Sequence, residues 1–166
     1  MATSSTQLPR PVRILEGQAA SERAAKALGR YYDELAERLE GGFRPELLDS
    51  VPGADVTPPR GDFILVTELG TAAVLGCGGV RLRADSGDTA ELQRIWLVPD
   101  LRGQGLGRFL LRALENRARA LGARRVVLSL NSSLNEAMTL CTSAGYQPVE
   151  PFEENPYVDV FLGKDL

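Results

Sequence analysis

The sequence predicts a single α/β domain in which a central, twisted and mostly antiparallel mixed sheet is flanked by about four helices. The apolar stretches of the first half are separated by short turns, as in hairpins. The second half alternates strand-like and helix-like stretches, as in β-α-β units. The length of 166 residues suits one domain, and we find no linker or repeat. We therefore expect a flexible tail at 1–10 and one domain at 11–166.

The first half is expected to contain strands, turns and one long helix. Between residues 19 and 39, apolar side chains recur at helical spacing, which predicts an amphipathic helix. The Pro- and Gly-rich stretch at 51–61 predicts a loop. The expected elements are, in order, a strand at 11–15, the helix at 19–39, a helical segment at 44–50, the loop at 51–61, and strands at 62–69, 72–82 and 89–98, with turns between the last three.

The second half is expected to alternate helices and strands. A leucine stripe predicts a helix over 105–121, with Gly122 as its C-terminal cap. The nearly continuous apolar run at 124–130 is typical of a strand covered on both faces. A helix at about 134–144 ends at Gly145. The remaining predicted elements are two closing strands at 146–150 and 157–163.

Composition narrows the classes of function. The net charge of -3 gives no basic patch for nucleic acid or anionic membranes, and no apolar run is long enough to span a bilayer. Cys77 and Cys141 match no metal or redox spacing, so we expect reduced thiols in a cytoplasmic protein without a secretory signal. The chain has no histidine, which excludes Ser-His and Cys-His catalysis and most zinc sites. We expect no metal.

Three alternating glycines stand where the helix at 105–121 begins. Gly103, Gly105 and Gly107 allow the backbone to approach a ligand, and a helix N-terminus favours anions. Arg102 and Arg108 add positive charge on either side. This arrangement suits a pyrophosphate, although the glycines could equally serve tight packing. Neither the Walker pattern nor the dinucleotide fingerprint is present, which argues against a nucleotide-binding protein of those types.

The stretch RGQGLG at 102–107 resembles the R/Q-x-x-G-x-G/A motif of the GNAT superfamily of N-acetyltransferases. Further segments resemble the same superfamily in the same order, over about residues 62–166, and the last is similar to small bacterial members. These segments are AELQRIWL, GARRVVLSL, NEAMTLCTSAGYQPV and PFEENPYVDVFLGKDL. The resemblance implies an N-acetyltransferase domain with a GNAT-like fold that uses acetyl-CoA as cosubstrate.

The resemblance also implies where acetyl-CoA binds. In the family, a bulge splays the central strand from its neighbour, and freed backbone groups bind the pantetheine arm. Donors of this kind stabilise a developing oxyanion. Trp96 could also be simply a core aromatic residue. The positions implied for acetyl-CoA are Ile95, Trp96 and Leu97 on the strand, Arg102, Gly103, Gln104, Gly105, Leu106, Gly107 and Arg108 at the turn, and Asn131 as a further contact.

The expected reaction is direct attack of an amine on the thioester in a ternary complex. The amine, with a pKa of about 10, must lose a proton, and in a chain without histidine a carboxylate must help. Glu91 stands where many members keep a strand glutamate, so we expect it to be the general base; otherwise it is a solvent-facing or salt-bridged residue. Arg94 could pair with Glu91 or bind an acceptor carboxylate.

The sequence departs from the family in two places. Cys141 stands where many members carry the tyrosine that protonates the leaving thiolate; it is a weak candidate for that role or a small buried side chain. Tyr146 and Tyr157 are candidate substitutes. Ser129 replaces a glutamate of some protein-acetylating members, and Leu134 replaces a cofactor-contacting asparagine. These departures argue against an enzyme of the ribosomal-protein type.

The acceptor site is expected across the sheet from the cofactor, between the first helix and the last two strands. The candidate acceptor-binding residues are Tyr31, Tyr32, Phe43, Arg94, Phe152, Asn155 and Tyr157. Either tyrosine of the first helix could instead belong to the core. The carboxylates at 152–155 could attract a cationic amine or simply be solvated.

The function that we expect is acetylation of a primary amine on a small molecule or amino acid-like compound, by a monomer or homodimer. The alternative is a non-catalytic module that binds and senses acyl-CoA with the same fold. A third class is a protein that uses the glycine turn for another phosphate ligand.

Overall fold

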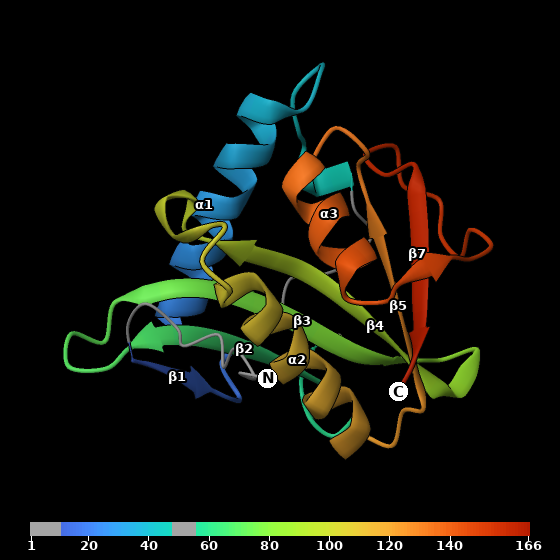
Figure 1. Ribbon diagram of the computed structural model, residues 1–166, viewed down its shortest axis with the longest axis horizontal. Coiled ribbons are helices and arrows are strands. Elements are labelled where there is room, and N and C mark those ends of the chain that lie inside the picture. Colours follow the sequence, from blue (N-terminus) through green and yellow to red (C-terminus); the bar gives the residue numbers. More distant parts are fainter. Residues whose placement is uncertain (1–10, 48–55) are drawn as a thin grey trace, which may run out of the picture.

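The computed structural model describes residues 11–47 and 56–166, so the expected tail and most of the expected loop at 51–61 lie outside the described residues. Seven strands form one sheet in the order β1-β2-β3-β4-β5-β7-β6, antiparallel except for β4 and β5 (Figure 1). The strands are β1 Val12–Leu15, β2 Gly61–Glu68, β3 Val74–Arg83, β4 Ser86–Leu97, β5 Arg125–Leu130, β6 Gln147–Pro148 and β7 Val160–Asp165. The mixed, mostly antiparallel sheet is thereby confirmed.

The described residues contain three α-helices rather than the expected four. The helices are α1 Glu22–Arg38, α2 Leu106–Ala120 and α3 Asn135–Ser143, with short 3-10 turns at Pro45–Leu47 and Pro99–Leu101. The helical segment expected at 44–50 is described only to residue 47, and its described part forms a single 3-10 turn. α1 begins after Ser21, whose side chain accepts from the Ala24 amide. No described helix is long and apolar enough to cross a membrane.

Most strand boundaries differ from the expected ones by one to three residues. β4 begins at Ser86, because the hairpin turn that precedes it is tighter than the predicted turn at 83–88. The strand expected at 146–150 is reduced to two residues, Gln147 and Pro148, although the Val149 amide still donates to the Phe161 carbonyl at 2.9 Å.

The helices cover opposite faces of the sheet. In Figure 1, α2 and α3 lie in front of the sheet and α1 lies behind it. The larger core cluster joins Leu110 and Leu114 of α2 to strand residues such as Ile64, whereas the smaller one joins Ala24 and Ala27 of α1 to the other face. β4 is therefore buried on both faces and runs through the centre of the domain.

The neighbouring strands β4 and β5 separate after a short contact. Only Thr89 to Glu91 pair with Arg125 to Val127, although β4 continues to Leu97. On its other side, β4 carries a bulge: Arg94 and Ile95 lie opposite Gly78 of β3, and Arg94 is in the left-handed region with φ 53°. We call the space between the diverging strands the fork.

We predict that Gly76→Ala lowers stability. A Cβ at Gly76 would lie 2.7 Å from the Trp96 carbonyl oxygen and 2.7 Å from Leu97 Cδ2. Overpacking of this kind costs about 1–3 kcal/mol. Urea denaturation should show this loss for Gly76→Ala, whereas Gly87→Ala, whose Cβ meets nothing within 4 Å, should be neutral or slightly stabilising. Equal midpoints for the two variants would contradict the prediction.

Candidate functional site

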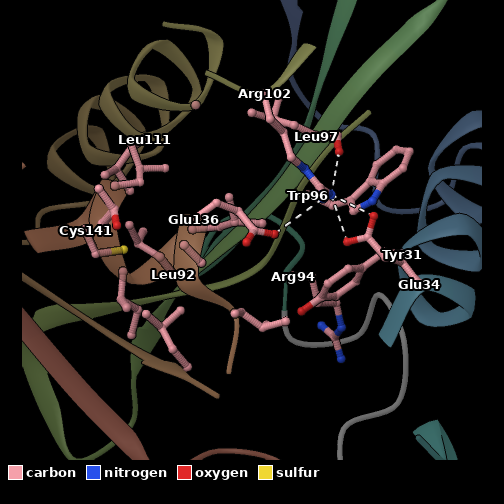
Figure 2. Close-up of a pocket in the computed structure, with 18 of the residues that line it drawn as sticks. Tyr31, Glu34, Leu92, Arg94, Trp96, Leu97, Arg102, Leu111, Glu136 and Cys141 are labelled. Atoms are coloured by element: carbon pink, nitrogen blue, oxygen red, sulfur yellow. Dashed lines mark hydrogen bonds and ion pairs between the residues drawn. The ribbon is translucent and has the colours of Figure 1, made fainter. Parts of the chain in front are cut away.

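The fork opens into a cavity of about 520 Å³ (Figure 2). Its lining includes every residue of β4 and β5 beyond their last pair, namely 92–97 and 128–130. Side chains of α1, α3 and the glycine turn complete the walls. Trp96 and Tyr31 lie on one side of Figure 2, and Cys141 and Leu111 lie on the other. The cavity thus joins the fork to the start of α2.

The glycine turn presents the N-terminus of α2 to this cavity. Gly103 and Gly105 have φ values of 78° and 85°, which residues other than glycine rarely adopt. Among the described residues, no side chain caps α2, and its first turn carries no acidic residue. The amides at this end therefore favour an anion. Gly107 instead allows close packing, because a Cβ there would lie 3.1 Å from Leu140 Cδ2.

Four charged side chains form a network across the mouth of the cavity. One terminal nitrogen of Arg102 (Nη2) donates to both oxygens of Glu34 at 2.8 Å and to the Leu97 carbonyl at 2.9 Å (Figure 2). Its other terminal nitrogen lies 3.5 Å from Glu136, which also forms a two-pronged pair with Arg38. The network links α1, the turn and α3.

The charges that line the cavity are mostly positive. Four arginines, at 38, 94, 102 and 108, stand against two glutamates, at 34 and 136. The whole chain, by contrast, carries a net charge of -3. A positively charged cavity in an acidic protein concentrates an anionic ligand at this one place.

Several uncharged polar groups also line the cavity. Burial raises the pKa of the Tyr31 phenol well above its usual value, so this group stays neutral. Burial also raises the pKa of Cys141 to about 11, which keeps its thiol protonated at neutral pH. The indole nitrogen of Trp96 is buried without a hydrogen-bond partner among the described residues.

Glu91 lies beside the fork but does not line the cavity. Its side chain is 5% exposed and receives hydrogen bonds at Oε2 from Arg81 at 3.0 Å and from Arg83 at 3.4 Å. Burial raises the pKa of this carboxyl, and the nearby Glu153 adds to the rise, whereas the two arginines oppose it. The structure thus brings Glu91 into a buried, arginine-paired setting rather than into the cavity.

Most of the residues expected to bind acetyl-CoA line the cavity. These are Ile95, Trp96, Leu97, Arg102, Gly103, Gly105, Gly107 and Arg108. Three others do not. Gln104 donates to the Asp100 carbonyl, Leu106 is 2% exposed in the core, and Asn131 donates to the Tyr157 carbonyl. The Gln104 side chain thus supports the turn, Leu106 packs in the core, and Asn131 holds the segment that precedes β7.

The structure does not bring the candidate tyrosine acids into the cavity. Tyr146 is 3% exposed, and its hydroxyl donates to Glu115 at 2.9 Å. Burial and this carboxylate raise the pKa of the Tyr146 phenol far above its usual value. The Tyr157 hydroxyl accepts from the Arg44 amide at 2.9 Å. This geometry does not support either tyrosine as the acid that protonates a leaving thiolate.

The candidate acceptor residues separate into two groups. Tyr31 and Arg94 line the cavity, and the Arg94 Nε donates to the Tyr32 hydroxyl at 3.2 Å. The Tyr32 ring continues through Phe43 to Tyr157, with centroids 5.4 and 4.7 Å apart. The other two candidates do not line the cavity: Phe152 packs edge-on against Phe161, and the Asn155 side chain accepts from the Tyr157 amide.

Sequence reasoning missed the charged residues of the helices that line the cavity. Glu34 and Arg38 share one face of α1 with Tyr31 and Leu35, at helical spacing. Two opposite charges within a buried stripe are the signal that could have identified them. Glu136, in the first turn of α3, gave no comparable signal, because an acidic residue is common at a helix start.

Comparisons with known proteins agree with this geometry. The model of the acetyltransferase (GNAT) family matches residues 28–146. An uncharacterised N-acetyltransferase of Schizosaccharomyces pombe is 33% identical over 104 residues, which cover 62% of this chain and 62% of that relative. The fold is similar to that of an acetyltransferase of Streptococcus agalactiae, with a TM-score of 0.75, 20% identity, and coverage of 93% of this chain and 98% of the other.

A second solved structure comes from Elizabethkingia anophelis. It is a GNAT family acetyltransferase with acetyl-CoA bound, and it matches with a TM-score of 0.64 and 18% identity over 93% of this chain and 98% of the other.

We predict a pH-dependent contribution of Glu136 to stability. Its hydrogen bonds with Arg38 lower the pKa of Glu136 to about 2. The stabilisation is therefore present above the unfolded pKa of about 4.3 and is lost as the pH falls towards 2. Because Glu136 is 43% exposed, the effect at pH 7 should stay below about 1 kcal/mol.

Urea denaturation of the wild type and Glu136→Gln should show a difference in unfolding free energy at pH 7 that shrinks below pH 4. Glu37→Gln, on the exposed side of α1, controls for the loss of one negative charge. A difference that stays constant from pH 7 to pH 3 would contradict the prediction.

Proposed function

The chain belongs to the acetyltransferase (GNAT) family, and on this premise we propose that it transfers an acetyl group from acetyl-CoA to a primary amine of a small molecule or amino acid-like acceptor. The observation that carries the proposal is the single cavity that joins the N-terminus of α2 to the fork between β4 and β5. One end suits an anion, and the other exposes strand edges that do not pair with each other.

The residues present fit acetyl-CoA as a cosubstrate. Gly103 and Gly105 allow backbone approach, and Arg102 and Arg108 supply guanidinium groups for a pyrophosphate. Backbone groups of β4 from Ile95 to Leu97 line the fork, where an extended arm could pair with the strand edge. When bound, acetyl-CoA supplies an activated thioester.

Residues at the fork can favour the reaction by orienting the two substrates and by stabilising charge. A backbone N–H directed at the thioester carbonyl stabilises the oxyanion that forms as the amine attacks directly in the ternary complex. The low-dielectric walls provided by Leu92, Leu111 and Leu128 strengthen that interaction. Glu91 remains a proposed base only through an intervening water, because its ion pairs separate it from the cavity.

The leaving thiolate requires little help from the protein. Cys141 lines the cavity with a protonated thiol and could donate to it. A thiol with an ordinary pKa of about 8.5 is also a tolerable leaving group without a protein acid. We therefore treat Cys141 as an accessory donor.

We predict that acetyl-CoA stabilises the protein against heat. At 100 times Kd, ligand binding contributes about 2.7 kcal/mol, which for a domain of this size raises Tm by roughly 5–10 °C. ATP and NADH at the same concentration serve as controls. A Tm shift with acetyl-CoA no larger than those with ATP and NADH would contradict acetyl-CoA as the cosubstrate. A specific shift without acetyl transfer to any amine would indicate a non-catalytic module that binds acyl-CoA.

We predict that Arg108→Ala weakens acetyl-CoA binding by about 10- to 100-fold, since a hydrogen bond to a charged group contributes about 1.5–3 kcal/mol. The matched control is Arg112→Ala, one turn further along α2, exposed and outside the cavity lining. Titration calorimetry measures both. An equal loss of acetyl-CoA affinity in the two variants would mean that Arg108 contributes only its positive charge and makes no specific contact with the ligand.

We predict that Cys141→Ala keeps kcat within about tenfold of the wild type, because the thiolate leaves readily by itself. A true general acid would contribute about 10²–10⁴-fold. Steady-state release of the CoA thiol measures this, with Cys141→Ser as the variant that restores a donor. A fall of more than 100-fold in Cys141→Ala that Cys141→Ser reverses would make Cys141 the acid.

A further inference from the structure

A second carboxylate, Glu153 on the loop between β6 and β7, lies beside the fork, where it contacts a cavity-lining residue without lining the cavity itself. Glu153 Oε1 accepts a hydrogen bond from the Ser129 hydroxyl at 2.5 Å, and Ser129 lines the cavity. Val126 and Leu128 of β5 pack in the core cluster with α2, so strand alternation turns Ser129 to the opposite face. Glu91 of β4 lies on that same face, since its neighbours Ala90 and Leu92 belong to the α2 cluster.

The loop that carries Glu153 is anchored next to the fork. Arg83 donates to the Phe152 carbonyl at 3.4 Å, and its guanidinium lies 4.9 Å from the centre of the Phe152 ring. The Phe152 ring also packs edge-on against Phe161 of β7, 5.2 Å away. Phe152, the residue before Glu153, is thus held by Arg83 of β3 and Phe161 of β7. The Glu153 carboxylate therefore has a defined position beside Ser129.

The surroundings of the two carboxylates differ in a way that matters for an incoming amine. Arg81 and Arg83 both bind Glu91, whose side chain is 5% exposed. Glu153 is half-buried, and its described hydrogen bond comes from a neutral hydroxyl. Glu153 also interacts electrostatically with Arg83, so its greater exposure is what distinguishes it from Glu91. A cationic amine can therefore reach the Glu153 carboxylate more readily than that of Glu91.

We propose that Glu153, positioned by Ser129 at the edge of the fork, is the catalytic carboxylate that binds the protonated amine of the acceptor and takes its proton. The inference rests on the proposed acetyl transfer. Glu153 accepts one proton from the ammonium group and passes it to solvent. The amine nitrogen then bonds to the acetyl carbon while the carbon–sulfur bond breaks, and the second nitrogen proton ends on the thiolate, giving the amide and the free CoA thiol.

This assignment explains the chemistry of a chain that lacks histidine and carries Ser129 on β5. A glutamate at the position of Ser129 would place its own carboxylate at the fork. In this chain the Ser129 hydroxyl instead binds the carboxylate of Glu153, which comes from the loop. Ser129 is accordingly a positioning residue, because it acts through Glu153. The neighbouring Glu154 is exposed, so the chain contains an internal control of equal charge.

The test compares Glu153→Gln with Glu154→Gln, using phenethylamine, cadaverine and lysine as probe amines. We expect Glu153→Gln to lower kcat/KM for the amine by about 10²–10⁴-fold, the usual contribution of a general base. Glu154→Gln should stay within twofold of the wild type. Ser129→Ala should lose about tenfold. The Tm shift with acetyl-CoA should be unchanged in all three variants.

The pH profile separates this role from a structural one. Without Glu153, the reaction must draw on free amine from solution, whose fraction rises about tenfold per unit below its pKa of about 10. We therefore expect kcat/KM of Glu153→Gln to rise about tenfold per pH unit between pH 7 and 9, while the wild type stays nearly flat.

The possible failures are distinguishable. A wild type that acetylates a probe amine together with an equally active Glu153→Gln would overturn the role of Glu153 alone. Loss of the acetyl-CoA shift in Glu153→Gln, or parallel pH profiles, would also overturn it, by assigning Glu153 to the cofactor site or the fold. A wild type without acetyl transfer to any amine would remove the proposed function, and this inference with it.

Discussion

The separation of β4 from β5 after three residue pairs is the constraint on which the cavity depends. Hydrogen bonding between the strands ends at Glu91, and the bulge at Arg94 then shifts the side-chain alternation of β4 by one residue. As a result, Ala90 and Leu92 pack on the α2 side, whereas Trp96 packs on the α1 side. A continuous ladder would close the fork and would turn the indole of Trp96 to the other face.

The charge network at the mouth couples ligand binding to the packing of the helices. Arg102 holds Glu34 of α1 and approaches Glu136 of α3, so one guanidinium joins three elements. An anion at the N-terminus of α2 draws on the same donors. Each hydrogen bond that it takes from Arg102 weakens the pairing of Arg102 with Glu34, whereas Arg38 already links α1 to α3 directly through its two hydrogen bonds with Glu136.

The order of strands and helices could be predicted from the sequence, because apolar periodicity records which faces are buried. The glycine turn could also be found, since its positive φ values require glycine. The direction of the Tyr146 side chain could not be predicted, because its partner Glu115 lies 31 residues away on α2. The pairing of Glu34 with Arg102, 68 residues away, likewise could not be predicted, since only the folded arrangement brings the two together. Contacts of this kind depend on tertiary packing, which local patterns do not record.

Of the two carboxylates beside the fork, the one that can take a proton from the amine is decided by accessibility rather than by basicity. Burial raises the pKa of Glu91, which would favour it as a base, but the same burial and its two arginines keep an amine away. Glu153, the proposed base, lies beside the fork on a loop anchored by Arg83, which also binds Glu91. One arginine thus contacts both the buried Glu91 carboxylate and the loop that carries the more exposed Glu153. A chain without histidine can in this way place a proton acceptor where a buried strand glutamate alone cannot reach.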